Sequence, residues 1–305
     1  MSIIVTGASG HFGRKAADLL LEKVPASELI LITRKPAALA EYAARGAQVR
    51  HGDFDDPASL PAAFAGGKRM LLISTDQVGG ERLRQHRSAM EAAMAAGVRQ
   101  IAYTSFVGVG PDNPAISTIE HTATEAMLRE CGVPFTFLRD SQYADAIAEF
   151  ALPGALAMGE WMSSAGDGKI ALVARDDCVA CAVTVVSTPG HDNKIYNITG
   201  PELLSYRDCA NLAIELSGRS LAYRAVSDEE KLAFFDSIGV PRRIEDGMEN
   251  SPIPWPGEEM VSFERAIREG HFAVLSDDVE RLTGRKPESL RQVCMAHIDK
   301  LRPAA

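Results

Sequence analysis

A glycine-rich turn near the N-terminus constrains the fold of this chain more than any other segment. The turn, Thr6–Gly13, lies between the apolar run Ile3–Val5 and a segment of helical periodicity. Glycine permits backbone torsions and close approaches that a Cβ atom would block. Amide groups at the start of the helix then face a phosphate group, whose negative charge the helix dipole favours. The alternative is a plain tight turn. In this context the turn predicts a βαβ unit that binds a dinucleotide through Gly7, Ser9, Gly10, His11, Phe12 and Gly13.

The first half of the chain alternates short β-rich runs with segments of helical periodicity. The β-rich runs are Ile3–Thr6, Leu29–Thr33, Gln48–Arg50, Met70–Ser74, Gln100–Ser105 and Phe135–Leu138. The helical segments between them are Phe12–Lys23, Ala37–Arg45, Ala58–Ala65, Arg82–Ala96 and Thr122–Glu130. A helix between two strands makes a crossover connection, so the strands are parallel and helices cover both faces of the sheet. We therefore expect an α/β fold with a doubly wound, parallel Rossmann sheet over residues 1–152.

The second half of the chain is less regular. Its pattern predicts strands at Ile170–Val173 and Ile195–Ile198 and helices at Asp176–Val186 and Ser205–Ser217. Three prolines within five positions make Ser251–Gly257 a loop, because proline disrupts a regular helix. We expect residues 153–305 to form a smaller α/β region on the substrate side, partly interleaved with the Rossmann sheet.

The charge balance and the apolar pattern exclude several classes of partner. The 305 residues include 32 Lys and Arg against 41 Asp and Glu, a formal net charge of −9. Such a surface repels phosphate backbones, and the basic residues are scattered, so we expect no nucleic-acid partner. Asp145, Glu149 and Pro153 interrupt the apolar stretch 144–158 too soon for a membrane-spanning helix, which needs about 20 apolar residues. Met1 leads directly into the first apolar run, which predicts no cleavable leader.

The cysteines predict a reducing compartment and no metal. Their number, five, is odd, and they are spread along the chain as Cys131, Cys178, Cys181, Cys209 and Cys294. Free thiols of this kind are typical of cytoplasmic proteins. Cys178 and Cys181 form a C-x2-C pair, but no second Cys or His pair completes a tetrahedral zinc site. We therefore expect a cytoplasmic protein with these two thiols on a buried helix turn and with no metal site.

The residues after the second predicted strand select between the two nicotinamide dinucleotides. An NAD site usually carries Asp or Glu about 20 residues after the glycines, where the carboxylate binds the ribose hydroxyls. Here the strand ends in Arg34 and Lys35, and residues 29–40 include no carboxylate. A guanidinium can bind a 2′-phosphate through two hydrogen bonds, which favours NADP(H) over NAD(H). The alternative is a solvated basic turn.

Asp53 and Phe54 follow the third predicted strand. A carboxylate and an aromatic ring at this edge suit the amino group and the ring face of an adenine, so we expect both residues in the cofactor site. The alternative for Asp53 is a loop or helix cap.

Taken together, these motifs resemble those of the NmrA-like, atypical short-chain dehydrogenase/reductases. Within this group, the chain is most similar to the type 2 NAD(P)H:quinone oxidoreductases and the triphenylmethane-dye reductases. The resemblance extends over nearly the whole chain and implies a Rossmann domain followed by a smaller C-terminal part. The matching stretches are Thr6–Gly13, Thr33–Pro36, Gly52–Phe54, Leu71–Ser74, Tyr103–Ser105, His121–Glu125, Leu138–Arg139, Ala165–Ile170, Arg175–Asp176, Tyr196–Pro201 and Leu282–Arg285.

The chain departs from ordinary short-chain dehydrogenases in its proton donor. Their catalytic Tyr-x-x-x-Lys motif is missing: counting back from Glu125, the lysine position falls on His121 and the tyrosine position on Ser117. Reduction of a simple ketone creates a strongly basic alkoxide and needs a positioned acid. Hydride addition to a quinone instead gives a phenolate-like oxygen with a pKa of about 10, and a cationic dye needs no acid. The missing pair therefore favours quinone-like or conjugated aromatic acceptors.

Ligands of open α/β sheets bind beyond the carboxyl ends of the strands. There we expect Ser74, Thr104 and Ser105 beside the cofactor. His121 is a candidate to orient the nicotinamide ribose or to act as a weak acid, and Tyr143 is the second candidate catalytic residue. The alternative for both is a packing role. The residues expected on the substrate side, where the resemblance implies Tyr143 and Phe150 and where Trp255 is a candidate lid, are Phe106, Gln142, Tyr143, Phe150 and Trp255.

The sequence thus predicts an NADPH-dependent oxidoreductase that transfers hydride to a small quinone-like or conjugated aromatic substrate. Two other interpretations stay open. One is an NmrA-like binding protein that senses NADP(H) without catalysis. The other is a carbonyl or sugar-nucleotide enzyme with an unrecognised acid, for which Tyr143 is the first suspect. Whether the chain forms a homodimer also stays open.

Overall fold

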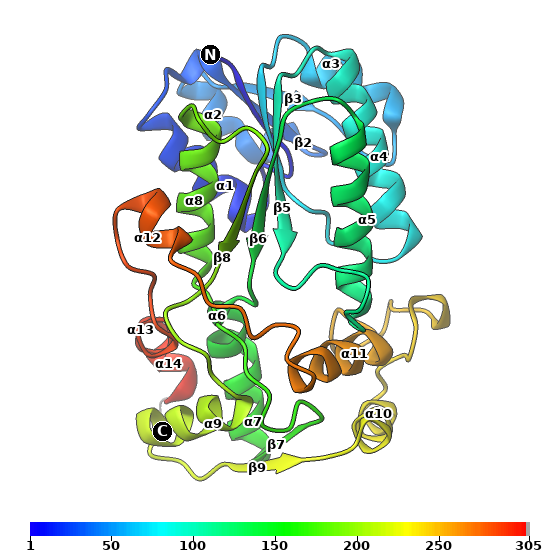
Figure 1. Ribbon diagram of the computed structural model, residues 1–305, viewed down its shortest axis with the longest axis vertical. Coiled ribbons are helices and arrows are strands. Elements are labelled where there is room, and N and C mark those ends of the chain that lie inside the picture. The colour runs from blue at the N-terminus through cyan, green and yellow to red at the C-terminus, as the bar shows by residue number, and fades with distance from the viewer. Residues whose placement is uncertain (303–305) are drawn as a thin grey trace.

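Seven parallel strands form the central sheet of the computed structural model, which describes residues 1–302 (Figure 1). Their order is β3-β2-β1-β4-β5-β6-β8. The strands are β1 (Ile3–Val5), β2 (Leu29–Thr33), β3 (Gln48–His51), β4 (Arg69–Leu72), β5 (Gln100–Phe106), β6 (Phe135–Asp140) and β8 (Lys194–Ile198). The strand order reverses between β1 and β4, and open α/β sheets bind ligands in the crevice at this switch point.

Helices cover the sheet on both faces (Figure 1). One face carries α1 (His11–Leu21) and α8 (Arg175–Ser187), which pack against each other, and the other carries α3 (Leu60–Phe64), α4 (Gly80–Ala95) and α5 (Ile116–Glu130). Ile3 and Val5 join the core under α1 and α8, whereas Ile4 joins the core under the other three helices. Successive side chains of a strand point to opposite faces, and both faces are apolar here because both are covered. The short elements η1 (Ala26–Glu28), η2 (Pro36–Leu39), α2 (Ala40–Ala44) and η3 (Pro57–Ser59) complete this half.

A smaller lobe lies beyond the carboxyl ends of the strands (Figure 1). Trp161 stacks on Tyr206 in its core, with ring centroids 5.0 Å apart. Its strands β7 (Glu160–Ser163) and β9 (Ala222–Ala225) pair in parallel. Its helices are α6 (Ala144–Ala146), the π-helical turn η4 (Ile147–Ala151), α7 (Leu152–Met158), α9 (Tyr206–Ser217), α10 (Asp228–Ser237), η5 (Ile244–Asp246), α11 (Gly257–Arg268), α13 (Leu290–Ala296) and α14 (Ile298–Leu301). The lobe faces the ligand-binding crevice of the sheet.

The sequence pattern predicted the α/β class and the Rossmann sheet, and both are confirmed. All six strands expected in the first half are present within one or two residues of their bounds. Helix α5 begins at Ile116 rather than Thr122, so Ser117 and His121 both lie on it. The prediction of a strand at Ile170–Val173 is wrong. Ile170 bridges Leu204 and Val173 bridges Tyr143, and these single contacts with two different segments form no ladder.

Three elements from the second half of the chain belong to the Rossmann layers. β8 pairs with β6, α8 packs against α1, and α12 (Asp278–Thr283) packs against α8. The chain therefore passes between the two lobes several times. A domain boundary at residue 152 stays a prediction.

None of the helices within residues 1–302 combines the length and the apolar composition needed to cross a bilayer. All five cysteines are free thiols. Cys178 and Cys181 are buried on α8, as the sequence predicts.

Candidate functional site

The glycine-rich turn joins β1 to α1 and brings the two elements unusually close. Gly7 adopts φ = +58°, a region that L side chains rarely enter. The Gly10 amide donates to the Gly7 carbonyl at 3.0 Å. A Cβ atom on Gly13 would lie 2.5 Å from the Gly7 oxygen and 2.6 Å from the Ala8 Cα atom. Only glycine at this position lets α1 begin so close to the end of β1.

The first turn of α1 is open to an anion. The N-cap residue is Gly10, which has no capping side chain, and the first turn carries no acidic residue. The first amide groups of the helix are therefore free donors, as at known phosphate sites. At the end of β4, the buried hydroxyls of Ser74 and Thr75 have no hydrogen-bond partner within residues 1–302. These unsatisfied donors fit a dinucleotide that lies across the crevice.

The end of β2 is tied to the glycine turn and presents two cations. The Thr33 hydroxyl donates to Ser9 Oγ at 2.8 Å and accepts from the Lys35 amide at 3.1 Å. Arg34 and Lys35 are exposed, and neither forms an ion pair with another described residue. Arg14 donates to the Ser9 and Ala38 carbonyls, which braces the loop. Both predicted cations are thus available to a 2′-phosphate beside the glycine turn.

Asp53 caps the turn after β3. Its Oδ1 atom accepts the Asp55 amide at 3.0 Å, which is the capping role that the sequence left open. Phe54 packs against the core that includes Ile30 and Ile32. Contact of Asp53 and Phe54 with an adenine stays a prediction.

A buried tyrosine–histidine pair joins the middle of β5 to α5. The Tyr103 hydroxyl lies 2.7 Å from His121 Nδ1, and both side chains are buried. Burial lowers the pKa of His121 well below its ordinary value, and the Arg82 charge acts in the same direction. Burial raises the pKa of Tyr103. The imidazole is therefore neutral, and the phenol keeps its proton.

His86 supports the neighbouring end of β4. Its Nε2 atom accepts the Thr75 amide at 3.2 Å, and its Nδ1 atom lies 3.0 Å from Thr124 Oγ1. Burial lowers the pKa of His86 to about 3, so this ring is neutral too. Both ring nitrogens are engaged, which gives His86 a positioning role.

A cluster of aromatic rings packs next to His121. The Phe106 ring centroid lies 6.1 Å from His121, 5.7 Å from Phe263 and 5.4 Å from Phe272. Phe263 comes from α11 and Phe272 from the segment after it. The lobe thus contributes two rings to the end of β5. The sequence predicted Phe106 but neither of its partners.

The predicted cofactor residues Thr104 and Ser105 differ in their availability. Thr104 Oγ1 accepts the Ser74 amide at 2.8 Å, which links the ends of β4 and β5. Ser105 Oγ donates to buried Glu125 at 2.7 Å, and Arg139 donates to both oxygens of the same carboxylate. Ser105 is therefore part of a closed ionic network. Its role in cofactor binding stays a prediction.

Tyr143 follows β6 and contacts Asp140 and Arg175. Its hydroxyl donates to Asp140 Oδ2 at 3.4 Å, and the Arg175 guanidinium lies 5.4 Å from its ring centroid. Burial raises the pKa of Asp140 to about 8, against the effect of hydrogen bonds from Cys178 and Tyr143. Arg175 also lies 3.5 Å from His11 Nδ1. Arg175 thereby links Tyr143 to the glycine turn, a role that its sequence position did not indicate.

The remaining predicted substrate residues are dispersed. Gln142 Oε1 accepts the Tyr206 hydroxyl at 3.0 Å. Phe150 is 69% exposed, and its ring lies under Lys300 of α14, 5.5 Å from the ammonium. Trp255 is 48% exposed in the loop before α11. Among the described residues, neither Phe150 nor Trp255 pairs with another aromatic ring, so their roles in the substrate site stay predictions.

The sequence model of a family described as NAD(P)H-binding matches residues 7–188, which include the glycine turn, β5 and the Tyr103–His121 pair. The chain belongs to the NAD(P)H-binding family. Quinone oxidoreductase 2 of Escherichia coli is 37% identical to this NAD(P)H-binding protein over 251 residues, 82% of this chain and 87% of the relative. The NAD(P)H azoreductase of Xenophilus azovorans is 29% identical over 97% of each chain.

Solved structures agree with this family assignment. The crystal structure of the NADPH-dependent quinone oxidoreductase of E. coli complexed with NADPH has a TM-score of 0.87 and 33% identity, and covers 96% of this chain and 99% of its own. The triphenylmethane reductase of Citrobacter sp. has a TM-score of 0.85 and 32% identity, and covers 98% and 100%. The predicted resemblance to quinone and dye reductases is confirmed. So are the predicted nicotinamide cofactor, NADP(H), and the assignment as an NAD(P)H-dependent oxidoreductase.

Proposed function

We propose that this chain is an NADPH-dependent reductase that transfers hydride to a quinone-like or conjugated aromatic acceptor. The observation that carries the proposal is the Tyr103–His121 pair, which joins β5 to α5. A neutral imidazole donates a hydrogen bond without giving up its proton. This is enough for an oxygen of phenolate basicity, whereas an alkoxide needs a positioned acid that delivers a proton. The relatives named as quinone, triphenylmethane and azo-compound reductases support the same class of acceptor.

The cofactor-binding groups divide between main chain and side chains. When bound, NADPH supplies the hydride. The free amides of α1 hold the pyrophosphate, and Arg34 and Lys35 hold the 2′-phosphate. The unsatisfied hydroxyls of Ser74 and Thr75 bind a ribose at the end of β4. Together these contacts fix the cofactor across the switch point of the sheet.

The Tyr103–His121 pair presents one hydrogen-bond donor to the acceptor. We assign the Tyr103 phenol as the donor to Nδ1, and this assignment puts the proton of the neutral imidazole on Nε2. Nε2 has no partner within residues 1–302. We assign it as the donor to the oxygen on which negative charge develops during hydride transfer. Water then supplies the final proton.

The aromatic cluster of Phe106, Phe263 and Phe272 supports binding of a planar acceptor. Flat conjugated molecules stack on such rings or meet their edges. Phe106 lies beside His121, so an acceptor in contact with Phe106 lies within reach of the donor. A saturated ketone gains neither the ring contacts nor an adequate acid.

A steady-state assay tests the proposal. Purified protein is given NADPH or NADH together with a simple quinone, a cationic triphenylmethane dye or an aliphatic ketone. We expect turnover of the quinone and of the dye, faster with NADPH, and none of the ketone. Tight NADPH binding without turnover of any acceptor would contradict the proposal and support a cofactor-sensing protein. Ketone turnover would support a conventional carbonyl reductase with a different acid.

A further inference from the structure

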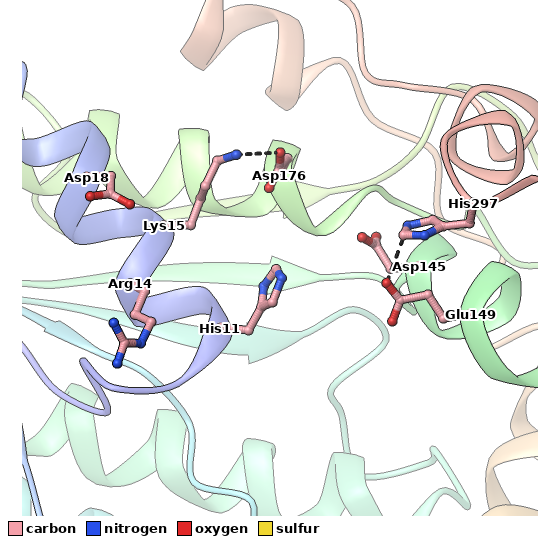
Figure 2. A pocket seen from close by; sticks show the side chains of 8 residues that line it. All are labelled: His11, Arg14, Lys15, Asp18, Asp145, Glu149, Asp176 and His297. Atoms are coloured by element: carbon pink, nitrogen blue, oxygen red, sulfur yellow. Dashed lines mark hydrogen bonds and ion pairs between the residues drawn. The ribbon is translucent and has the colours of Figure 1, made fainter. Parts of the chain in front are cut away.

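A groove at the seam between the two lobes holds metal-ligating side chains that the proposed reaction does not use. Its volume is about 440 Å³. It lies between α1, the start of α8, the α6–η4 turn and the junction of α13 and α14 (Figure 2). At one end of the groove, two carboxylates and an imidazole point toward one another (Figure 2).

These three side chains converge from two distant segments. Asp145 on α6 and Glu149 on η4 are four residues apart, so they share one face of a continuous helical turn. His297 comes from the junction of α13 and α14. One ligand atom from each residue lies within 4.8 Å of the other two. All three are partly buried, which leaves them accessible from the groove.

The two carboxylates of the cluster have few basic neighbours. His297 Nε2 lies 3.3 Å from Glu149 Oε1, and the Arg175 guanidinium lies 3.9 Å from Asp145 Oδ1. The other cations of the groove are engaged elsewhere. Lys15 pairs with Asp176 at 2.9 Å, and Arg14 pairs with Glu41. The two carboxylates therefore have one imidazole and one distant guanidinium as their basic neighbours.

A main-chain hydrogen bond orients one of the carboxylates. The Arg175 amide donates to Asp145 Oδ2 at 2.8 Å, which leaves Oδ1 facing the cluster. Ligand carboxylates of metal sites are commonly fixed in this way by outer hydrogen bonds. The groove in front of the cluster has room for water molecules to complete a coordination shell.

We propose that Asp145, Glu149 and His297 bind a divalent transition-metal ion such as Mn²⁺ together with water. Two carboxylate oxygens and one imidazole nitrogen favour first-row transition metals over Mg²⁺ and Ca²⁺, which prefer all-oxygen shells. The ion replaces the Glu149–His297 ion pair and joins the α6–η4 turn to the C-terminal helices. Its effect is structural: it stabilises the native state in proportion to its occupancy. The sequence alone predicted no metal site, and this proposal departs from that expectation.

A titration followed by electron paramagnetic resonance tests the site directly. Tag-free, chelator-treated protein is titrated with Mn²⁺, and the signal of free Mn²⁺ reports binding. We expect one saturable site, weakened at least about tenfold by Glu149→Gln or His297→Gln. Asp18→Asn is the matched control, because Asp18 lines the same groove outside the cluster. The absence of a saturable site, or equal weakening by all three substitutions, would overturn the proposal.

Two further readouts separate the site from a folding defect and from the thiols. Mn²⁺ is expected to raise the midpoint of thermal unfolding of the wild-type protein but not of His297→Gln, whose circular dichroism without metal matches wild type. Co²⁺ is expected to give weak visible bands typical of oxygen and nitrogen ligands. A strong cobalt–thiolate band would assign the ion to Cys178 and Cys181 and contradict the proposal. None of these measurements depends on reductase activity.

Discussion

The two ends of the crevice differ in which groups form them: main-chain groups at one end and side chains at the other. At the β1–β2 end, the main chain forms the candidate site. Gly7 and Gly13 let α1 begin close to the end of β1, and the first amides of α1 are free to bind an anion. At the β5–β6 end, buried side chains from separate elements contact one another, as in the Tyr103–His121 pair and the Ser105–Glu125 contact. Under the proposed function, backbone shape binds the cofactor, and the side-chain networks act in the chemistry. We expect substitutions at one end to change either cofactor affinity or kcat, but not both.

The largest effect is expected at Gly13. In Gly13→Ala, the added Cβ atom meets backbone atoms at 2.5 and 2.6 Å, so α1 must shift away from the turn. We expect NADPH affinity, measured by isothermal titration calorimetry, to fall at least about 100-fold, which is about 2.7 kcal/mol. Gly154→Ala in α7 is the control, because its Cβ would meet nothing within 4 Å. Unchanged NADPH binding by Gly13→Ala would show that cofactor binding at the β1–β2 end does not depend on backbone shape.

Substitution of the tyrosine–histidine pair should affect chemistry alone. We expect His121→Gln and Tyr103→Phe to lower kcat for a quinone about 10- to 100-fold, because the donor is lost or loses its orientation. The NADPH dissociation constant should stay within about threefold of wild type. The rate with a cationic dye, which needs no proton, serves as the internal control. An equal loss with quinone and dye would mean that the pair is structural rather than a donor.

Arg34, the first of the two cations after β2, should control the choice between NADPH and NADH. In Arg34→Ala we expect NADPH affinity to fall about tenfold or more, since a charge-assisted hydrogen bond is worth about 1.5–3 kcal/mol. NADH affinity should not change, and the ratio of kcat/KM values for the two cofactors measures this. Arg45→Ala is a suitable control, because Arg45 is an exposed arginine that pairs with Asp18. An equal loss of affinity for NADPH and for NADH would place Arg34 outside the 2′-phosphate site.

A separate prediction concerns the pH dependence of stability at the β5–β6 end of the crevice. Folding raises the pKa of Asp140 to about 8 from 3.8, so between these values the folded state holds a proton that the unfolded state releases. The free energy of unfolding therefore falls as pH rises, by up to about 1.4 kcal/mol per unit. In Asp140→Asn this slope should disappear, and the variant should gain stability relative to wild type from pH 5 to pH 8 (roughly the window set by the two pKa values).

Urea unfolding at several pH values measures this slope. Tyr143→Phe is the control, because it removes the 3.4 Å hydrogen bond but keeps the buried carboxyl. Its slope should match wild type. Parallel curves for wild type and Asp140→Asn would show that Asp140 is ionised in the folded protein.

The sequence predicted those parts of the molecule that are local in the chain. The glycine turn, the first six strands and the exposed Arg34–Lys35 pair all lie within or next to their own motifs. Helix α5 was predicted too short, because its first turn contains Ile116, Ser117 and Thr118, residues with modest helix propensity. Ile170–Val173 has the composition of a strand, but its neighbours contact it only at single residues.

The side-chain networks escaped prediction because their partners are remote or inconspicuous. Tyr103 lies within an apolar strand, where a tyrosine is typical of core packing. Phe263 and Phe272 meet Phe106 only after the lobe has folded back onto the sheet. His297 joins Asp145 and Glu149 across about half the length of the chain. No local pattern marks such encounters, so only the folded arrangement reveals them.

The return of β8 and α8 to the Rossmann layers has a consequence for how the protein can be divided. A fragment that stopped near residue 152 would leave the outer edge of β6 without its neighbour and α1 without the helix that covers it. Such an open, apolar edge invites pairing with other chains. The residues that we propose to bind the dinucleotide therefore depend on the later half of the chain for their packing.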